Sequence, residues 1–377
     1  MEAWRTVGDI RIERGGAARL DAHVAGLPNA RVAVVTDGGV AKLGLMDAGL
    51  EALRAAGHAV RVWSDVVADP PEEVVEGIAD GVRDWGAELV VGFGGGSPMD
   101  TAKVVACLVG SDQPLATMYG VGNVKGPRLP LMLVPTTSGT GSEVTNVAIL
   151  TTGRTAKQGI VADPLYADRV LLDAELTLGL PAHITAATGI DAMVHAIEAY
   201  TSQHRKNPMS DALALTALRK LRRALVRATT DGRDVEARED MLLGAMIAGQ
   251  AFSNAPVGAV HGLAYPLGGF FHVPHGLSNS LVMTEVIRFN SEEARARRWY
   301  GEIAGELGLE ASPGALIDEI ERLKDGTRVA RRLRDVDVPD SAIRMMADDA
   351  ITKERVLRNN PREMGYGNIV AIYEAIA

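Results

Sequence analysis

The sequence predicts an α/β domain with a parallel sheet over residues 1–180, followed by an all-helical domain over residues 181–377. In the first half, short apolar runs alternate with stretches of helical periodicity, which is typical of a parallel sheet covered on both faces. From about residue 182, long Ala- and Leu-rich segments with helical periodicity follow one another. A chain of 377 residues also exceeds one ordinary hydrophobic core, so two domains are expected.

The first half contains four apolar runs that indicate buried strands, each ending at a turn or a polar loop. Helical segments lie between them: residues 38–57 end at Gly57, and residues 71–86 open with Pro71 and an acidic first turn. The four strands are expected in RVAVVTD (31–37), HAVRVWSDV (58–66), AELVVGFGGGSPMD (87–100) and RLPLMLVPTTSGTGSEVT (128–145). Residues 147–152 and 169–177 resemble further strands. In the second half, the helices are expected in residues 184–202, 209–229 and 236–253 and in further segments toward the C-terminus.

Composition excludes several classes of protein. The net charge of −9 argues against nucleic acid and against an anionic membrane surface as partners. The single cysteine, Cys107, rules out a disulfide within the chain and fits a reducing compartment. The first 16 residues lack the apolar core of a signal peptide, and no apolar run reaches the ~18 residues that span a bilayer. We therefore expect a cytoplasmic protein.

A glycine turn, GFGGGSPMD (92–100), follows one expected strand and precedes a helical segment. Gly95 and Gly96 would let a phosphate approach the backbone amides, and the helix N-terminus adds partial positive charge. Ser97 can donate a further hydrogen bond. Tight turns also need glycine, so a structural role is the alternative.

A second polar segment, PTTSGTGSEVT (135–145), follows the next strand. Because ligands of parallel sheets bind at the carboxyl ends of the strands, both segments fall where a diphosphate or a nicotinamide would lie. The alternative is a Ser/Thr-rich turn whose backbone groups are satisfied internally. The expected cofactor-binding residues of this loop are Thr136, Thr137, Thr140, Ser142 and Thr145.

Asp37 ends the first expected strand, where a carboxylate can accept hydrogen bonds from an adenosine ribose and would repel a 2′-phosphate. This predicts NAD(H) rather than NADP(H) as the cofactor. The alternative is that Asp37 only caps the helix that begins beside it.

One acid and three histidines predict a metal site. Asp191 and His195, in GIDAMVHAIEAY, have the i,i+4 spacing that places two side chains on one face of a helix. His261 and His275 flank a Gly/Pro-rich stretch that can fold back toward that face. Three imidazoles and a carboxylate suit iron(II) or zinc. His272 lies three residues before His275 and is an alternative ligand.

Taken together, these motifs resemble the iron-containing (group III) alcohol dehydrogenase family over essentially the whole chain. The matching segments are GGGSPMDTAK, PTTSGTGSEVT, GIDAMVHAIEAY, NPMSDALAL, HGLAYPLGG, PHGLSN and NPRE. The resemblance implies a dinucleotide-binding α/β domain and a helical metal-binding domain. It also implies that Asp191, His195, His261 and His275 hold the metal, which favours His275 over His272.

The resemblance further implies roles near the cofactor for Lys157, Asp100 and Lys103. The chain departs from the family at Tyr265, where a second histidine usually stands in HGxxHPLGG. That histidine belongs to the catalytic surroundings, so we assign Tyr265, His272 and Asp100 to those surroundings as candidates. Tyr265 could act through its phenol or could simply line the substrate pocket.

The function expected is reversible hydride transfer between a small alcohol and NAD, with a divalent metal as Lewis acid. Fe²⁺ is expected, with Zn²⁺ or Mn²⁺ as possible occupants. Phe252, Tyr265, Phe270 and Phe271 suggest a small, fairly apolar substrate. A homodimer or higher homo-oligomer is expected from the resemblance. The alternatives are a maleylacetate-reductase-like enzyme, a dehydroquinate-synthase-like lyase that also combines NAD and a metal, and an inactive nucleotide-binding relative.

Overall fold

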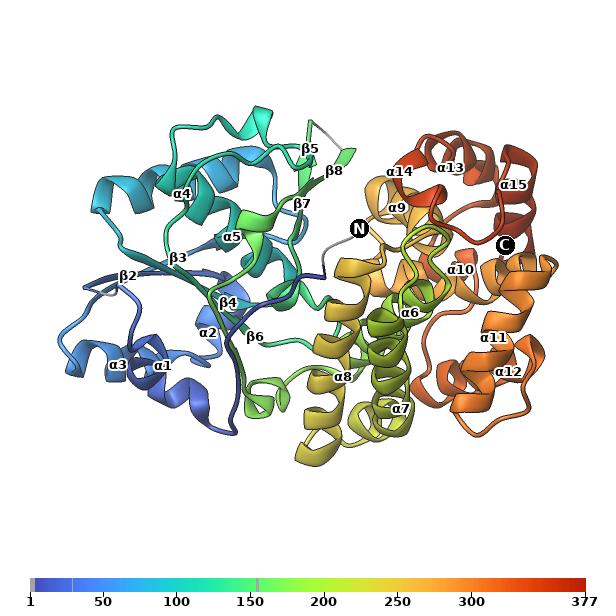
Figure 1. The fold of residues 1–377 in the computed structure, drawn as a ribbon, viewed down its shortest axis with the longest axis horizontal. Helices are drawn as coiled ribbons and strands as arrows, with labels where there is room; N and C mark the ends of the chain where they lie inside the picture. Colours follow the sequence, from blue (N-terminus) through green and yellow to red (C-terminus); the bar gives the residue numbers. More distant parts are fainter. Residues whose placement is uncertain (1–3, 29, 154–155) are drawn as a thin grey trace. The chain divides into compact units, whose positions relative to one another are not determined.

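The computed structural model describes residues 4–28, 30–153 and 156–377 (Figure 1). The chain forms two compact units, Met1–Thr137 with Gly141–Leu178 and Ser138–Thr140 with Gly179–Ala377. The first unit is α/β and the second is helical, which confirms the predicted fold class. The short segment Ser138–Thr140 packs with the helical unit, although the chain on both sides of it belongs to the first.

A six-stranded parallel sheet forms the centre of the first unit, in the order β1-β9-β6-β4-β2-β3. Its strands are β1 (Ile10–Ile12), β2 (Arg31–Asp37), β3 (Ala59–Val66), β4 (Leu89–Gly94), β6 (Leu131–Pro135) and β9 (Arg169–Leu172). Gly94 and Pro135 are paired at the carboxyl ends of β4 and β6, and β2 beside β4 ends at Asp37. The sheet therefore brings the glycine turn, the Thr-rich loop and Asp37 to one edge.

Helices cover both faces of this sheet. On one face, Leu89, Val91 and Phe93 of β4 join a core formed with α1 (Leu20–Val24) and α3 (Asp47–Ala55). On the other face, α5 (Gly96–Gly110) packs against β4, with α4 (Glu72–Trp85) beside it. The approach of α5 requires Gly92, since a Cβ there would lie 2.7 Å from the Cβ of Ala102. Figure 1 shows the α4–α5 layer and the α1–α3 layer on opposite sides of the strands.

Two segments of this unit differ from the sequence prediction. The helix expected over 38–57 is two helices, α2 (Gly38–Lys42) and α3, because Gly44 between them adopts a φ of +66°. The strand expected over 169–177 ends at Leu172. A 3-10 turn, Ala174–Thr177, follows because the Asp173 carboxylate accepts a hydrogen bond from the Glu175 N–H at 3.0 Å.

The strand expected at 147–152 lies outside the main sheet. It is β7 (Val147–Thr152), which pairs antiparallel with β8 (Ala156–Val161) in a small sheet of order β5-β8-β7. The third strand, β5 (Gly120–Val121), pairs parallel to β8. Strands β1, β5 and β8 were not predicted, because they are short or carry little apolar alternation.

The second unit is built around α6 (Ala182–Thr201), which packs against α7, α8 and α10. Every residue from Gly189 to Thr201 is buried, which explains the run of alanine and other apolar residues in this helix. The remaining helices are α7 (Pro208–Thr230), α8 (Val235–Asn254), α9 (Ala259–Phe271), α10 (His275–Asn290), α11 (Ala294–Glu306), α12 (Pro313–Thr327), α13 (Ile343–Ala350), α14 (Glu354–Leu357) and α15 (Tyr366–Ala375). Among the described helices, none combines the length and the apolar character that crossing a bilayer requires.

Candidate metal centre and cofactor site

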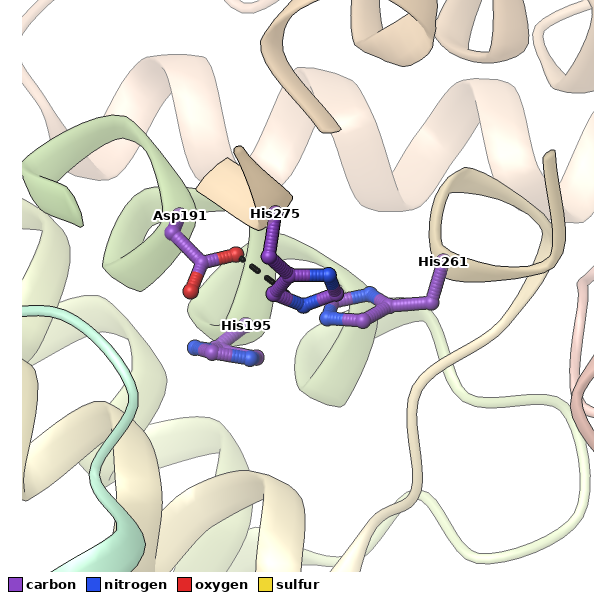
Figure 2. A group of neighbouring side chains, drawn as sticks. All are labelled: Asp191, His195, His261 and His275. Carbon is purple, nitrogen blue, oxygen red and sulfur yellow. Dashed lines mark ion pairs between the residues drawn. The ribbon is translucent and has the colours of Figure 1, made fainter. Parts of the chain in front are cut away.

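Three helices of the second unit bring the four predicted metal-binding residues together. Asp191 and His195 lie one turn apart on α6, His261 lies in the first turn of α9, and His275 is the first residue of α10. One potential ligand atom from each residue lies within 4.8 Å of the others. Figure 2 shows the carboxylate and the three imidazole rings gathered around one point.

The approach of α10 to α6 depends on Gly276. A Cβ at this position would lie 2.2 Å from the backbone oxygen of Ala187 on α6 and 3.1 Å from the Cβ of Asp191. The glycine therefore allows the two helices to touch through their backbones. As a result, His275 Nε2 lies 3.7 Å from Asp191 Oδ1, the pair marked by a dashed line in Figure 2.

The group is buried except on one side. Asp191, His195 and His261 are at most 4% exposed, whereas the side chain of His275 is 42% exposed. Burial lowers the pKa of His195 to about 3, so its ring is neutral. Burial alone would raise the pKa of Asp191, but the three histidines and the Asn279 amide hold it below its ordinary value.

Two residues that the sequence analysis did not assign complete the surroundings. The Glu198 carboxylate lies 2.6 Å from His261 Nδ1, and the Asn279 amide nitrogen donates to Asp191 Oδ1 at 2.6 Å. The same nitrogen lies 3.3 Å from Nε2 of both His261 and His275, so these two Nε2 atoms face one point. The sequence contains a signal for Glu198, because this residue lies seven positions after Asp191 and three after His195, on the same helix face. Burial disfavours a charged His261, but Glu198 outweighs it and raises the pKa of this ring.

The residues present fit a divalent transition metal. With Nδ1–H of His261 directed at Glu198, Nε2 of that ring carries a lone pair toward Asp191 and His275. The ring of His195 is also buried and offers one nitrogen to the same group of ligand atoms. Several acceptors that converge in a buried place are costly unless a cation satisfies them. Three imidazoles and one carboxylate are a donor set suited to iron(II), zinc or manganese.

Aromatic rings flank two of the histidines. Phe252 of α8 stacks on His195, with ring centroids 4.3 Å apart, and Tyr265 lies nearly parallel to His275 at 6.4 Å. Burial raises the pKa of Tyr265, which keeps the hydroxyl protonated. Of the other two predicted pocket residues, Phe271 packs against the helical core and Phe270 is 38% exposed.

His272 is not part of the group. It ends α9 in a left-handed conformation (φ +54°), and it is exposed. Its N–H donates to the Gly268 carbonyl at 3.1 Å, which closes the helix. The ligand group contains His275 and leaves out His272.

In the first unit, Asp37 caps a helix. Its Oδ1 accepts hydrogen bonds from the N–H groups of Gly39 (2.8 Å) and Val40 (2.9 Å) at the start of α2. Its Oδ2 faces the glycine turn, 3.5 Å from where a Cβ of Gly94 would lie. The capping role considered from the sequence is therefore present, and it uses only one of the two oxygens.

The glycine turn opens α5. Gly94 has a φ of +151° and a Cβ there would meet Pro98 at 2.7 Å, so this position requires glycine. Gly95 precedes the first helical residue, Gly96, and a Cβ on Gly95 would lie 3.4 Å from the Thr137 methyl. The turn and the start of the Thr-rich loop are thus in contact.

Lys157 and Ser97 meet at a residue that the sequence did not single out, Asp69. Lys157 Nζ lies 2.5 Å from Asp69 Oδ1, and Ser97 Oγ accepts a hydrogen bond from the Asp69 N–H at 3.3 Å. Thr151 Oγ1 donates to the Asp69 carbonyl at 2.9 Å. This links the small sheet to the glycine turn.

Asp100 is engaged in a buried network. Its carboxylate accepts from Ser142 Oγ at 2.5 Å and from the Ile149 N–H at 2.9 Å. Lys103, also buried, donates to Ser142 Oγ and to the Val147 carbonyl at 2.8 Å, and to Thr145 Oγ1 at 3.3 Å. Four of the residues expected near the cofactor (Asp100, Lys103, Ser142 and Thr145) thus tie α5 to the Thr-rich loop and β7.

The remaining loop residues are divided between the units. Thr136 is buried, and its N–H donates to the Gly94 carbonyl at 2.9 Å beside Thr137. Thr140 belongs to the segment that packs with the helical unit.

Comparisons with known proteins agree over both units. The family described as "Iron-containing alcohol dehydrogenase" matches residues 8–174, and "Fe-containing alcohol dehydrogenase family, C-terminal" matches residues 185–377. Long-chain-alcohol dehydrogenase 1 of Geobacillus thermodenitrificans is 39% identical over 372 residues, which cover 96% of this chain and 93% of the relative.

Two solved structures extend the likeness. The structure of 1,3-propanediol oxidoreductase matches with a TM-score of 0.95 and 31% identity, over 100% of both chains. The structure of sulfoacetaldehyde reductase from Bifidobacterium kashiwanohense, determined in complex with NAD⁺, matches with a TM-score of 0.88 and 30% identity, over 100% of this chain and 99% of that one. The named substrates of these relatives differ widely in polarity.

Proposed function

This chain belongs to the iron-containing alcohol dehydrogenase family, and we propose that its Fe²⁺ is held by Asp191, His195, His261 and His275. The protein is an oxidoreductase that acts on CH–OH groups, as an alcohol dehydrogenase or an aldehyde reductase. The observation that carries the metal proposal is the group of four potential ligand atoms within 4.8 Å. The complete set of one acid and three histidines favours the alcohol dehydrogenase branch over maleylacetate reductases. The apolar segments around these residues argue against a lyase, which would need a Lys- and Arg-rich pocket for a phosphorylated sugar acid.

The metal and NAD(H), when bound, would supply Lewis-acid polarisation of the substrate oxygen and the hydride exchange itself. The chain's own residues position these groups. Phe252 holds the His195 ring by stacking, and Glu198 holds the His261 ring through Nδ1. Neutral imidazoles leave a net positive charge on a divalent ion with one carboxylate ligand, and that charge is what favours an anionic substrate oxygen.

We propose that NAD(H) binds at the carboxyl edge of the parallel sheet. The backbone of Gly95 and Gly96 would receive the pyrophosphate at the start of α5, where the helix contributes partial positive charge. Ser97, Thr136 and Thr137 would contact the cofactor at the same turn, and Asp37 Oδ2, which faces Gly94, would accept a hydrogen bond from the adenosine ribose. Lys157 would meet the cofactor together with Asp69. Asp100, Ser142 and Thr145 would shape this edge from inside their network, and Thr140 stays among the residues proposed to bind the cofactor.

Asp37→Ser is expected to weaken the preference for NAD(H) over NADP(H) by about tenfold or more. Serine keeps an oxygen that can cap α2, so the fold should hold, while the charge that repels a 2′-phosphate is removed. The measurement is the ratio of kcat/KM for NADH and NADPH in the wild type and in the variant. Asp47→Ser, at an exposed carboxylate in the first turn of α3, is the control and should leave the ratio unchanged. Equal use of both cofactors by the wild type would contradict the proposal.

We propose that the substrate is a small, fairly apolar alcohol or aldehyde, and that the Tyr265 hydroxyl takes part in proton movement beside His275. Phe252 and Tyr265 give the surroundings of the histidines an aromatic, apolar character. Tyr265 stands where the family pattern usually has a histidine, and His272, which closes the end of α9, lies outside the group of ligand atoms.

Tyr265→Phe is expected to lower kcat by about a hundredfold and to change the shape of the pH–rate profile, because only the hydroxyl is lost. KM for the alcohol should change much less. Tyr373→Phe is the matched control: its buried hydroxyl donates to the Leu263 carbonyl at 2.6 Å, so its loss should affect stability without altering the pH profile. If Tyr265→Phe behaves like the control, Tyr265 only lines the pocket.

We also propose that the protein is cytoplasmic and acts as a homodimer or a larger homo-oligomer. The single cysteine is buried and burial raises the pKa of its thiol to about 12, which suits a reducing compartment and no covalent assembly. Light scattering after size-exclusion chromatography measures the molar mass of the protein in solution. A mass of one chain, 39.9 kDa, would contradict the proposed oligomer.

The direct test of the proposed function is NADH formation with a panel of simple alcohols, and NADH consumption with the matching aldehydes. We expect turnover in both directions, fastest with short unbranched substrates. Absence of turnover with every member of the panel, in metal-loaded protein, would contradict the proposal.

A further inference from the structure

We infer that Glu198 is a positioning residue that fixes the tautomer and the orientation of the His261 ring for metal binding. This inference rests on the proposed metal site and adds a residue to its surroundings. Glu198 is 6% exposed and lies on α6, one turn beyond His195. Its two oxygens act on two neighbouring residues of α9, and they act in different ways.

The first oxygen holds the start of α9. Glu198 Oε1 accepts a hydrogen bond from the Val260 N–H at 2.7 Å. The residue before α9 is Gly258, which has no side chain to cap the helix, so a carboxylate from another helix satisfies this free N–H. Gly258 also makes room, since a Cβ there would lie 3.4 Å from Oε1. The backbone of His261, one residue further on, is thereby fixed against α6.

The second oxygen acts on the ring of His261. Glu198 Oε2 lies 2.6 Å from Nδ1, in a place where both groups are buried. A carboxylate only accepts hydrogen bonds, so the proton of a neutral ring must sit on Nδ1. Nε2 then carries the lone pair, and Nε2 is the atom that faces Asn279 and the other ligands. A carboxylate on the far nitrogen of a metal-binding histidine also increases the basicity of the ligating nitrogen.

Because Glu198 accepts a hydrogen bond in both contacts, the neutral side chain of glutamine cannot replace it. In Glu198→Gln, the amide has one acceptor and one donor, whereas the Val260 N–H and the His261 Nδ1–H both require acceptors. If the amide oxygen stays on Val260, the amide NH₂ faces Nδ1 and the ring must move its proton to Nε2. The lone pair would then point away from the metal. Glutamine is therefore expected to disturb metal binding although it matches glutamate in size.

Two separate measurements test the inference: the affinity of the protein for Zn²⁺, and the tautomer of the His261 ring. In Glu198→Gln, we expect Zn²⁺ affinity, measured by competition with a chromophoric chelator without NAD or alcohol, to fall about 10- to 100-fold. Glu319→Gln is the matched control, because Glu319 is another buried carboxylate of the same unit, paired with Arg222 and Arg322. It should bind Zn²⁺ like the wild type. Wild-type affinity in Glu198→Gln would overturn the inference.

The second measurement needs neither metal nor a stable Glu198 variant. In metal-free wild-type protein at alkaline pH, ¹⁵N labelling of histidine should show His261 protonated on Nδ1, with its signal assigned by its loss in His261→Ala. Protonation on Nε2 would overturn the inference even if Glu198→Gln fails to fold. If wild-type protein binds no metal but His261 is protonated on Nδ1, the proposed metal site fails while the role of Glu198 in fixing the ring stands.

Discussion

His275→Ala is expected to lower kcat/KM for alcohol oxidation by about a thousandfold or more and to leave the protein with less than stoichiometric metal. Loss of one of four ligands removes Lewis-acid stabilisation worth several kcal/mol. The fold should persist, since His275 is the first residue of α10 and its side chain is 42% exposed. The measurements are steady-state kinetics with NAD and metal content by elemental analysis.

The matched control is His272→Ala, three residues earlier in the chain. His272 is an exposed residue at the end of α9, outside the ligand group. This variant should keep its metal and most of its activity. If His272→Ala loses the metal and His275→Ala retains it, the ligand assignment is wrong.

Gly276→Ala is expected to destabilise the helical unit by about 2–3 kcal/mol and to weaken metal binding. The added methyl would lie 2.2 Å from the Ala187 carbonyl oxygen, which is backbone and cannot rotate away, so α10 must move from α6. His275 and Asp191, on opposite sides of this contact, would move apart. Urea unfolding and Zn²⁺ competition measure the two effects.

Gly268→Ala provides the comparison for Gly276→Ala. Gly268 lies within α9, and a Cβ there would meet only the Val273 carbonyl oxygen, at an ordinary 3.6 Å. Alanine favours the helix over glycine by up to about 1 kcal/mol, so this variant should be as stable as the wild type or more stable. Equal stability of Gly276→Ala and the wild type would show that the close approach of α10 and α6 is not required.

The sequence predicted those features that leave a periodic or compositional signal. The strands β2, β3, β4 and β6 are apolar runs bounded by turns, and the helical unit is visible in its periodicity. Asp191 and His195 share a helix face because their spacing of four residues matches one helical turn. For these elements, local sequence and tertiary structure agree.

Other features depend on contacts between distant segments, which spacing does not reveal. The distance between His275 and Asp191 depends on how α10 packs against α6, and the absence of a side chain at Gly276 permits that packing. Asp69 is one acidic residue among many in the sequence, and only the fold places it against Lys157. For the same reason, the sequence did not show that both carboxylate oxygens of Asp100 accept hydrogen bonds, one from Ser142 Oγ and one from the Ile149 N–H.

Some signals were present but ambiguous. Asp37 could bind a ribose or cap a helix, and the structure shows the cap on one oxygen while the other faces Gly94. Glu198 follows His195 on the same helix face, but a glutamate in an Ala-rich helix is also compatible with a surface position. Its burial and its contact with His261 distinguish the two.

The most direct test of the proposed iron site is the metal dependence of hydride transfer. Protein purified without oxygen should contain about one iron per chain, and it should form NADH from a simple alcohol. After treatment with a chelator, activity should be lost, and it should return when Fe²⁺ is added. Metal-free wild-type protein that oxidises alcohols with NAD as fast as the loaded protein would contradict the proposed role of the metal.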